Sequence, residues 1–150
     1  MIIIKWVTFL VVCSFVFGAY VPEVVAKEVA RNIYFEHENL HGGDDFLISQ
    51  TEIINEKGNK LIYIFHLIPK GFIMVPADDQ AVPNLAFGFE HSFESNNMPF
   101  NLNSLMSQYK TELQTMVNIQ NVPESKIKEL WNNYINGSIK SDHSRDVSPL

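Results

Sequence analysis

Three apolar segments separated by short turns constrain the fold of this chain more than any other feature of its sequence. They are FLISQTEII (46–54), KLIYIFHLI (60–68) and FIMVPA (72–77). Their β-branched and aromatic side chains are typical of β-strands. Residues 56–59 and 69–71, which separate them, contain the Gly, Asn and Pro of tight turns. The sequence therefore predicts an antiparallel meander of three or four strands, the fourth being LAFGF at 85–89.

A helix is predicted before this block of strands. From Pro22 onward, apolar residues such as Val25 and Val29 repeat every four positions, and the glycine pair at 42–43 ends the pattern. This spacing predicts an amphipathic helix over about 22–40.

Two further helices are predicted after the strands. The first begins at Leu102, where apolar residues take up helical spacing, and Asn101 or Asn103 is available as its N-cap. The second covers 123–135 and stops before Gly137. The order helix, antiparallel strands, helices indicates the α+β class, with one sheet covered on a face by helices.

The N-terminal segment 1–19 differs from the rest of the chain. Lys5 is its one charged residue, and the apolar run that follows ends in the small residues Gly18 and Ala19. This pattern is typical of a secretory signal peptide. We expect cleavage after Gly18 or Ala19, a secreted or periplasmic protein, and no membrane attachment after cleavage. An uncleaved anchor and a lipid on Cys13 are the alternatives.

Composition and charge exclude several classes of function. The 46% hydrophobic and 12% aromatic content indicates one folded domain, which we place at 20–139, followed by a polar tail at 140–150. The one cysteine, Cys13, lies in the signal segment, so the mature domain has no disulfide and no thiol nucleophile. The net charge of −6 argues against nucleic acid and anionic membranes as partners. No motif calls for a cofactor.

Two sets of residues are candidate metal ligands. His37, Glu38 and His41 match H-E-x-x-H, in which two histidines one helical turn apart bind zinc and the glutamate acts as a base. No convincing third ligand follows, so we favour a helix C-terminus whose histidines suit the helix dipole. The acidic pairs at 44–45 and 78–79 lack the alternating ligands of a calcium loop and are expected to be turn residues.

Residues 71–102 carry a family resemblance. Its motifs are GFIMVPADD (71–79), SFE (92–94) and NMPFNL (97–102). They resemble the propeptide of streptopain-type cysteine peptidases and the free-standing Spi-type inhibitors built on the same module. The resemblance extends over about 22–150, and VSPL at 147–150 resembles the segment that leads into the peptidase domain of that family. The catalytic cysteine and histidine of the peptidase domain are absent here.

The resemblance implies how such a domain acts. In zymogens of this family, a loop between the sheet and the following helix blocks the active site, and an asparagine of the loop enters the catalytic centre. The corresponding loop here is 93–103, and the asparagine falls on Asn101, with Asn103 as the alternative. A side-chain amide offers a donor and an acceptor without a charge, so it can fill the site without reacting.

Three residues just before Asn101 complete the expected inhibitory loop. Pro99 restricts Met98 to an extended conformation, which lowers the entropy lost when the loop docks. Met98 and Phe100 are expected either to anchor the loop on the peptidase or to plug the end of the domain's own core.

The expected function is therefore that of a secreted inhibitor of a streptopain-like cysteine peptidase, without catalytic residues of its own. A prodomain fragment of a truncated peptidase precursor would act by the same mechanism. A zinc hydrolase that uses 37–41 and a surface-binding module are the alternatives from other classes.

Overall fold

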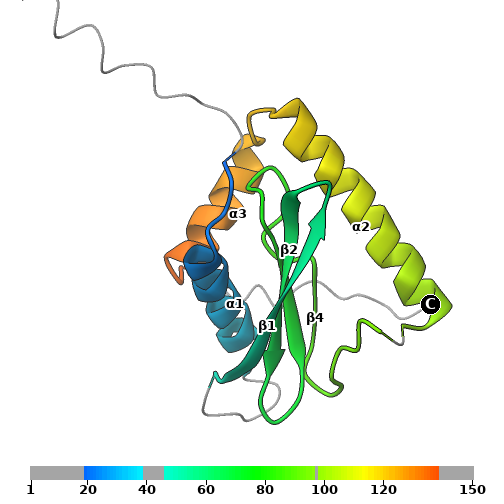
Figure 1. Cartoon of the computed structure of the whole chain (residues 1–150). Coiled ribbons are helices and arrows are strands. Elements are labelled where there is room, and N and C mark those ends of the chain that lie inside the picture. The colour runs from blue at the N-terminus through cyan, green and yellow to red at the C-terminus, as the bar shows by residue number, and fades with distance from the viewer. Residues whose placement is uncertain (1–18, 39–45, 97, 139–150) are drawn as a thin grey trace, which may run out of the picture.

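The computed structural model describes residues 19–38, 46–96 and 98–138 (Figure 1). Its elements are α1 (Glu23–Glu38), β1 (Ile48–Glu56), β2 (Asn59–Leu67), β3 (Phe72–Pro76), β4 (Ala86–Gly88), α2 (Phe100–Ile119) and α3 (Ser125–Ile135). The described strands form one four-stranded antiparallel sheet in the order β1-β2-β3-β4. The predicted α+β class, with one N-terminal and two C-terminal helices, is confirmed. Among the described residues, no helix is long and apolar enough to cross a bilayer.

The turns on both sides of β2 contain residues with positive φ angles. Lys57 and Gly58 form the turn between β1 and β2, with φ angles of 50° and 84°. Positive φ at both turn positions gives the hairpin a twist that matches its strands. Between β2 and β3, the Leu67 N–H donates to the Gly71 carbonyl at 2.9 Å, and Gly71 has a φ of 115°. The predicted meander therefore forms through two tight connections.

Helices cover both faces of the sheet, not one face as we expected. α1 and α3 pack on one face and α2 packs on the other (Figure 1). Tyr63 and Phe65 of β2 belong to the core under α1 and α3, whereas Ile62 and Ile64 belong to the core under α2. All four side chains are fully buried. A strand that is covered on both faces needs apolar residues at successive positions, which explains the continuous apolar run in β2.

The core on the α1 side is closed by α3. Trp131 of α3 is buried in the same cluster as Val29 of α1, and its indole N–H donates to the Ala81 carbonyl at 2.8 Å. The Asn32 side-chain amide of α1 donates to the Tyr134 carbonyl at 2.6 Å. α3 is therefore tied both to α1 and to the connection between β3 and β4.

α2 begins earlier than the predicted start at Leu102. Its first residue is Phe100, and the capping residue is Pro99, which makes no side-chain capping hydrogen bond. The expected capping role of Asn101 or Asn103 is therefore wrong. Proline suits a position at the start of a helix because its φ is already restricted and its missing N–H breaks no helical hydrogen bond there.

Candidate functional site

The segment between β4 and α2 is packed against the domain at two points. Phe93 is buried, and its ring centroid lies 5.3 Å from that of Phe72. Met98 is half-buried and packs against the core under α2. Of the residues expected in the inhibitory loop, Met98 therefore lies on the domain's own core.

α2 is held against the sheet by both apolar and polar contacts. Met106 is buried in the core beneath the helix. The Tyr109 hydroxyl donates to the Leu85 carbonyl at 2.9 Å, and the Gln80 side-chain amide donates to the Met116 carbonyl at 3.0 Å. These contacts fix α2 on the sheet and thereby fix the position of its N-terminal turn.

The first turn of α2 carries three of the predicted inhibitory residues. Phe100, Asn101 and Asn103 are exposed, and the exposed fraction of Phe100 is 88%. The Asn103 N–H donates to the Pro99 carbonyl at 2.9 Å, and the Ser104 hydroxyl donates to the Phe100 carbonyl at 3.0 Å. Our expectation that all these residues lie in a loop is therefore wrong. The loop ends at Pro99 because hydrogen bonds of the helix already begin there.

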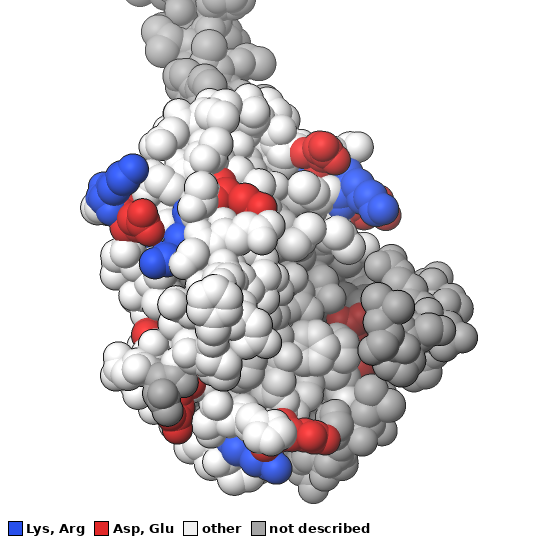
Figure 2. Space-filling view, turned by 90° about the vertical axis from the view of Figure 1, so that its right-hand side faces the viewer, with Lys and Arg blue, Asp and Glu red and all other residues white. Residues whose placement is uncertain are grey.

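The surface around α2 carries little charge. The first turn of the helix has no acidic residue, so no side chain within it offsets the partial positive charge of the helix N-terminus. The exposed side chains along α2 are mainly neutral and polar, such as Ser104, Ser107, Gln108, Thr111 and Thr115. Figure 2 shows that charged side chains on this side of the molecule are few and scattered, with both signs present. Protein–protein interfaces are likewise poor in charged residues at their centre.

His37, the first histidine of the H-E-x-x-H match, makes contacts inside the fold. Its Nδ1–H donates to the Ile33 carbonyl at 2.9 Å, and its ring centroid lies 4.2 Å from that of Phe87. His41 and the side chain of Glu38 lie outside the described residues. In the described part of the chain, no three His, Cys, Asp or Glu side chains come close enough together to hold a metal ion.

The acidic pair after β3 stabilises a turn, as its sequence indicates. Asp78 Oδ1 accepts hydrogen bonds from the backbone N–H of Gln80 at 2.9 Å and from its side-chain amide at 3.0 Å. Asp79 Oδ1 accepts from the Ala19 N–H at 2.7 Å. Burial raises the pKa of the Asp79 carboxyl, and the hydrogen bond from Ala19 opposes this effect. The other pair, at 44–45, lies outside the described residues.

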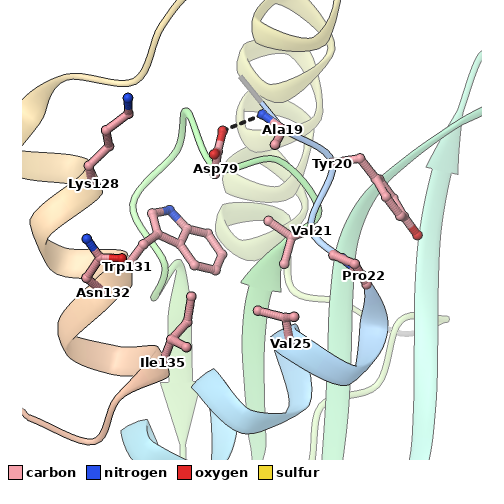
Figure 3. Close-up of a pocket in the computed structure, with 10 residues that line it drawn as sticks. All are labelled: Ala19, Tyr20, Val21, Pro22, Val25, Asp79, Lys128, Trp131, Asn132 and Ile135. Atoms are coloured by element: carbon pink, nitrogen blue, oxygen red, sulfur yellow. Dashed lines mark hydrogen bonds between the residues drawn. The ribbon is translucent and has the colours of Figure 1, made fainter. Parts of the chain in front are cut away.

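A pocket of about 330 Å³ lies beside Asp79 (Figure 3). It is formed by the residues before α1, the first turn of α1, the turn after β3, and α3. Its apolar lining includes Val21, Val25, Trp131 and Ile135, and its charged residues are Asp79 and Lys128. The pocket has no signature in the sequence because its walls come from segments far apart in the chain, and the Asp78-Asp79 pair indicates only a turn.

A family model described as Spi protease inhibitor matches residues 19–113, which is more than half of the chain. The match begins just before α1, includes the sheet and ends inside α2. It contains the exposed first turn of α2 but not α3. No curated protein and no solved structure matches the chain.

Proposed function

This chain belongs to the Spi protease inhibitor family, and we propose that it is a secreted inhibitor of a streptopain-like cysteine peptidase. Family membership supports the broader role in protease inhibition. The finer proposal is carried by one observation, the exposed first turn of α2 with Phe100, Asn101 and Asn103 on its surface. In this proposal the turn enters the active site, and Asn101 lies nearest the catalytic residues.

The helical backbone of this turn makes it a poor substrate. A peptidase must place a carbonyl group in reach of its nucleophile and its oxyanion hole. Here the Phe100 carbonyl already accepts a hydrogen bond from the Ser104 hydroxyl at 3.0 Å, and the Asn103 carbonyl accepts one from the Ser107 hydroxyl at 2.9 Å. Cleavage would require the turn to unwind, so the turn can occupy the site without being cut.

The chemistry of the turn suits the charges of a cysteine peptidase site. Asn101 offers a donor and an acceptor, which can pair with a catalytic histidine or with oxyanion-hole donors. The nucleophile of such enzymes is a thiolate, and a negative group is favoured near a helix N-terminus. α2 has no acidic residue in its first turn that would repel the thiolate.

Phe100 supplies the apolar part of the proposed contact. Its side chain is almost fully exposed in the free domain, so its ring is available to a pocket of the partner. Complete burial of an aromatic side chain stabilises a complex by about 1.5–3 kcal/mol. We therefore assign Phe100 as the anchor and Asn101 as the polar contact at the catalytic centre.

The test is an inhibition titration of a purified streptopain-like peptidase with the wild-type chain, Asn101→Ala and Asn103→Ala. Both asparagines are exposed in the same helical turn, so the two variants are matched. We expect Asn101→Ala to raise the inhibition constant about ten- to hundred-fold, because buried groups of the peptidase lose their partner at a cost of about 1–3 kcal/mol. Asn101→Asp should also weaken inhibition, because it replaces the donor with a charge.

The thermal stability of each variant serves as the control. Because both side chains are exposed, the melting temperatures should stay within a few degrees of the wild-type value. A large loss of inhibition with Asn103→Ala and none with Asn101→Ala would move the contact to Asn103. Unchanged inhibition in both variants would exclude the asparagine mechanism, and no inhibition by the wild-type chain would exclude this class of target.

A further inference from the structure

The first described residues of the chain pair with the turn after β3. Tyr20 forms an antiparallel bridge with Asp78, and the Val21 N–H donates to the Ala77 carbonyl at 2.9 Å. At the end of this pairing, the Asp79 N–H donates to the Ala19 carbonyl at 3.1 Å, and the Ala19 N–H donates to Asp79 Oδ1 at 2.7 Å (Figure 3). The Ala19 nitrogen is therefore held at a defined place beside a carboxylate.

The surroundings of the Asp79 carboxylate favour a cationic partner. Its pocket is lined largely by apolar side chains, including Val21 and Trp131, and burial raises the pKa of the carboxyl. Two other charges act on Asp79: Asp78, which is negative, and Lys128 on α3, which is positive. A half-buried carboxylate with a second acid beside it is stabilised more by a positive charge than by a neutral N–H.

The sequence before Ala19 favours one of the two expected cleavage positions. Signal peptide cleavage favours small residues at the last position of the signal and two positions before it, where large aromatic residues fit worst. A cut after Gly18 places Gly18 and Val16 at these positions, whereas a cut after Ala19 places Ala19 and the much larger Phe17 there. The sizes of the side chains at these two positions thus favour Ala19 as the first residue of the mature chain.

We propose that Asp79 is the binding site for the α-ammonium group of the mature chain, formed when the signal is cut between Gly18 and Ala19. Hydrolysis of this peptide bond by one water leaves a carboxylate on Gly18 and, after protonation, an ammonium on Ala19. The neutral hydrogen bond of the uncut chain thereby becomes an ion pair that holds residues 19–21 against 77–79. This inference rests on the proposed export, not on the proposed inhibition of a peptidase.

The ion pair makes stability depend on pH in a defined direction. An α-amino group ordinarily has a pKa of about 8, and the Asp79 carboxylate raises that pKa in the folded chain because it favours the charged form. Between the pKa of the Asp79 carboxyl and about pH 8 both the carboxylate and the ammonium are charged, so the stabilisation is fully present there. It is lost as pH rises through the raised pKa of the amine. The positive charge of Lys128 lowers the pKa of the Ala19 amine, and the negative charge of Asp78 raises it.

The test compares the chain that begins with a free Ala19 with the same chain acetylated on the Ala19 nitrogen. Acetylation keeps the N–H donor and removes the charge, so it isolates the ion pair. At pH 6.5 we expect the free chain to melt about 2–5 °C higher, and the difference should vanish near pH 10. In the Asp79→Asn background the free and acetylated chains should melt together. Equal melting temperatures in the wild-type background would overturn the proposal.

Two further measurements test the ion pair in the wild-type chain, without the Asp79→Asn variant. The pKa of the Ala19 amine, measured by NMR in the wild-type mature chain, should lie above 8, and an ordinary or lower value would contradict the ion pair. The mass of the exported protein should correspond to a chain that starts at Ala19, and a start at Tyr20 would contradict the assignment. Neither result depends on whether the protein inhibits a peptidase.

Discussion

At the scale of single residues, Tyr63 shows how the N-terminal segment is held over the sheet. Its side chain is fully buried, its hydroxyl donates to the Val21 carbonyl at 2.9 Å, and the Tyr20 hydroxyl lies 2.6 Å away. Burial raises the pKa of Tyr63 well above its ordinary value, and the hydrogen bond with Tyr20 adds to this effect. β2 therefore fixes the residues just before α1 through the phenol group of Tyr63.

We expect Tyr63→Phe to lower the free energy of unfolding by about 1–3 kcal/mol at pH 7, because the buried Val21 carbonyl loses its donor. The pKa of Tyr63 is higher in the folded chain than in the unfolded chain, so its neutral phenol stabilises the fold below about pH 10. This contribution is lost as Tyr63 of the unfolded chain ionises at higher pH. The difference between wild type and variant should therefore shrink from pH 9 to pH 11 in urea titrations. A constant difference over this range would contradict the role of the buried phenol. Tyr20→Phe is the control, because it keeps the Tyr63 phenol.

At the scale of elements, the two turns that flank β2 each contain a glycine, but the space around the two glycines differs. Gly58 and Gly71 both have positive φ. A Cβ added at Gly58 would meet no atom within 4 Å. A Cβ at Gly71 would lie 2.9 Å from the Gly88 carbonyl oxygen and 3.2 Å from Phe89 Cα. The close approach of β4 to the β2–β3 turn therefore depends on Gly71.

We expect Gly58→Ala to lower the free energy of unfolding by about 1 kcal/mol, since only the positive φ is strained. Gly71→Ala should lower it by about 3 kcal/mol or more, because the added methyl also displaces the backbone next to β4. Equilibrium denaturation of the two variants measures the contrast directly. Equal destabilisation would mean that β4 moves away from the turn without penalty.

At the scale of the whole molecule, the fold extends beyond the matched region. The family match ends at residue 113, yet Trp131 of α3 is buried against α1 and donates to the Ala81 carbonyl. Without α3, the side of α1 and the sheet that Trp131 covers would face water. We therefore propose that the folded domain extends to about residue 139.

A chain of residues 19–120, which lacks α3, should lose its cooperative thermal transition, whereas a chain of residues 19–138 should melt like the longer chain. Truncating one buried Trp to alanine costs about 3–5 kcal/mol, which is a large part of the 5–15 kcal/mol that stabilises a typical domain. Calorimetry of both truncations tests this expectation. A cooperative transition at the wild-type temperature for residues 19–120 would show that α3 is dispensable.

The order and type of the elements could be predicted from the sequence because they depend on neighbouring residues. The spacing of Val25 and Val29 indicates a helix, Gly58 indicates a turn, and the apolar run in β2 indicates a buried strand. The candidate site was predicted only as a set of residues, since the family motifs pointed to Asn101 but did not show that it lies in a helix. In the structure, Phe100 is the first residue of α2, and the Asn103 N–H already donates to the Pro99 carbonyl, so Asn101 lies within the helix.

The face of the sheet that each helix covers and the contacts of Asp79 depend on how distant parts of the chain pack together. Helical spacing shows that a helix has an apolar side but not which face of a sheet that side will meet. The Ala19–Asp79 contact joins residues 60 positions apart, and the Trp131–Ala81 contact joins residues 50 positions apart. Such pairings form only when distant segments of the chain pack on the sheet together, so no local pattern of residues encodes them.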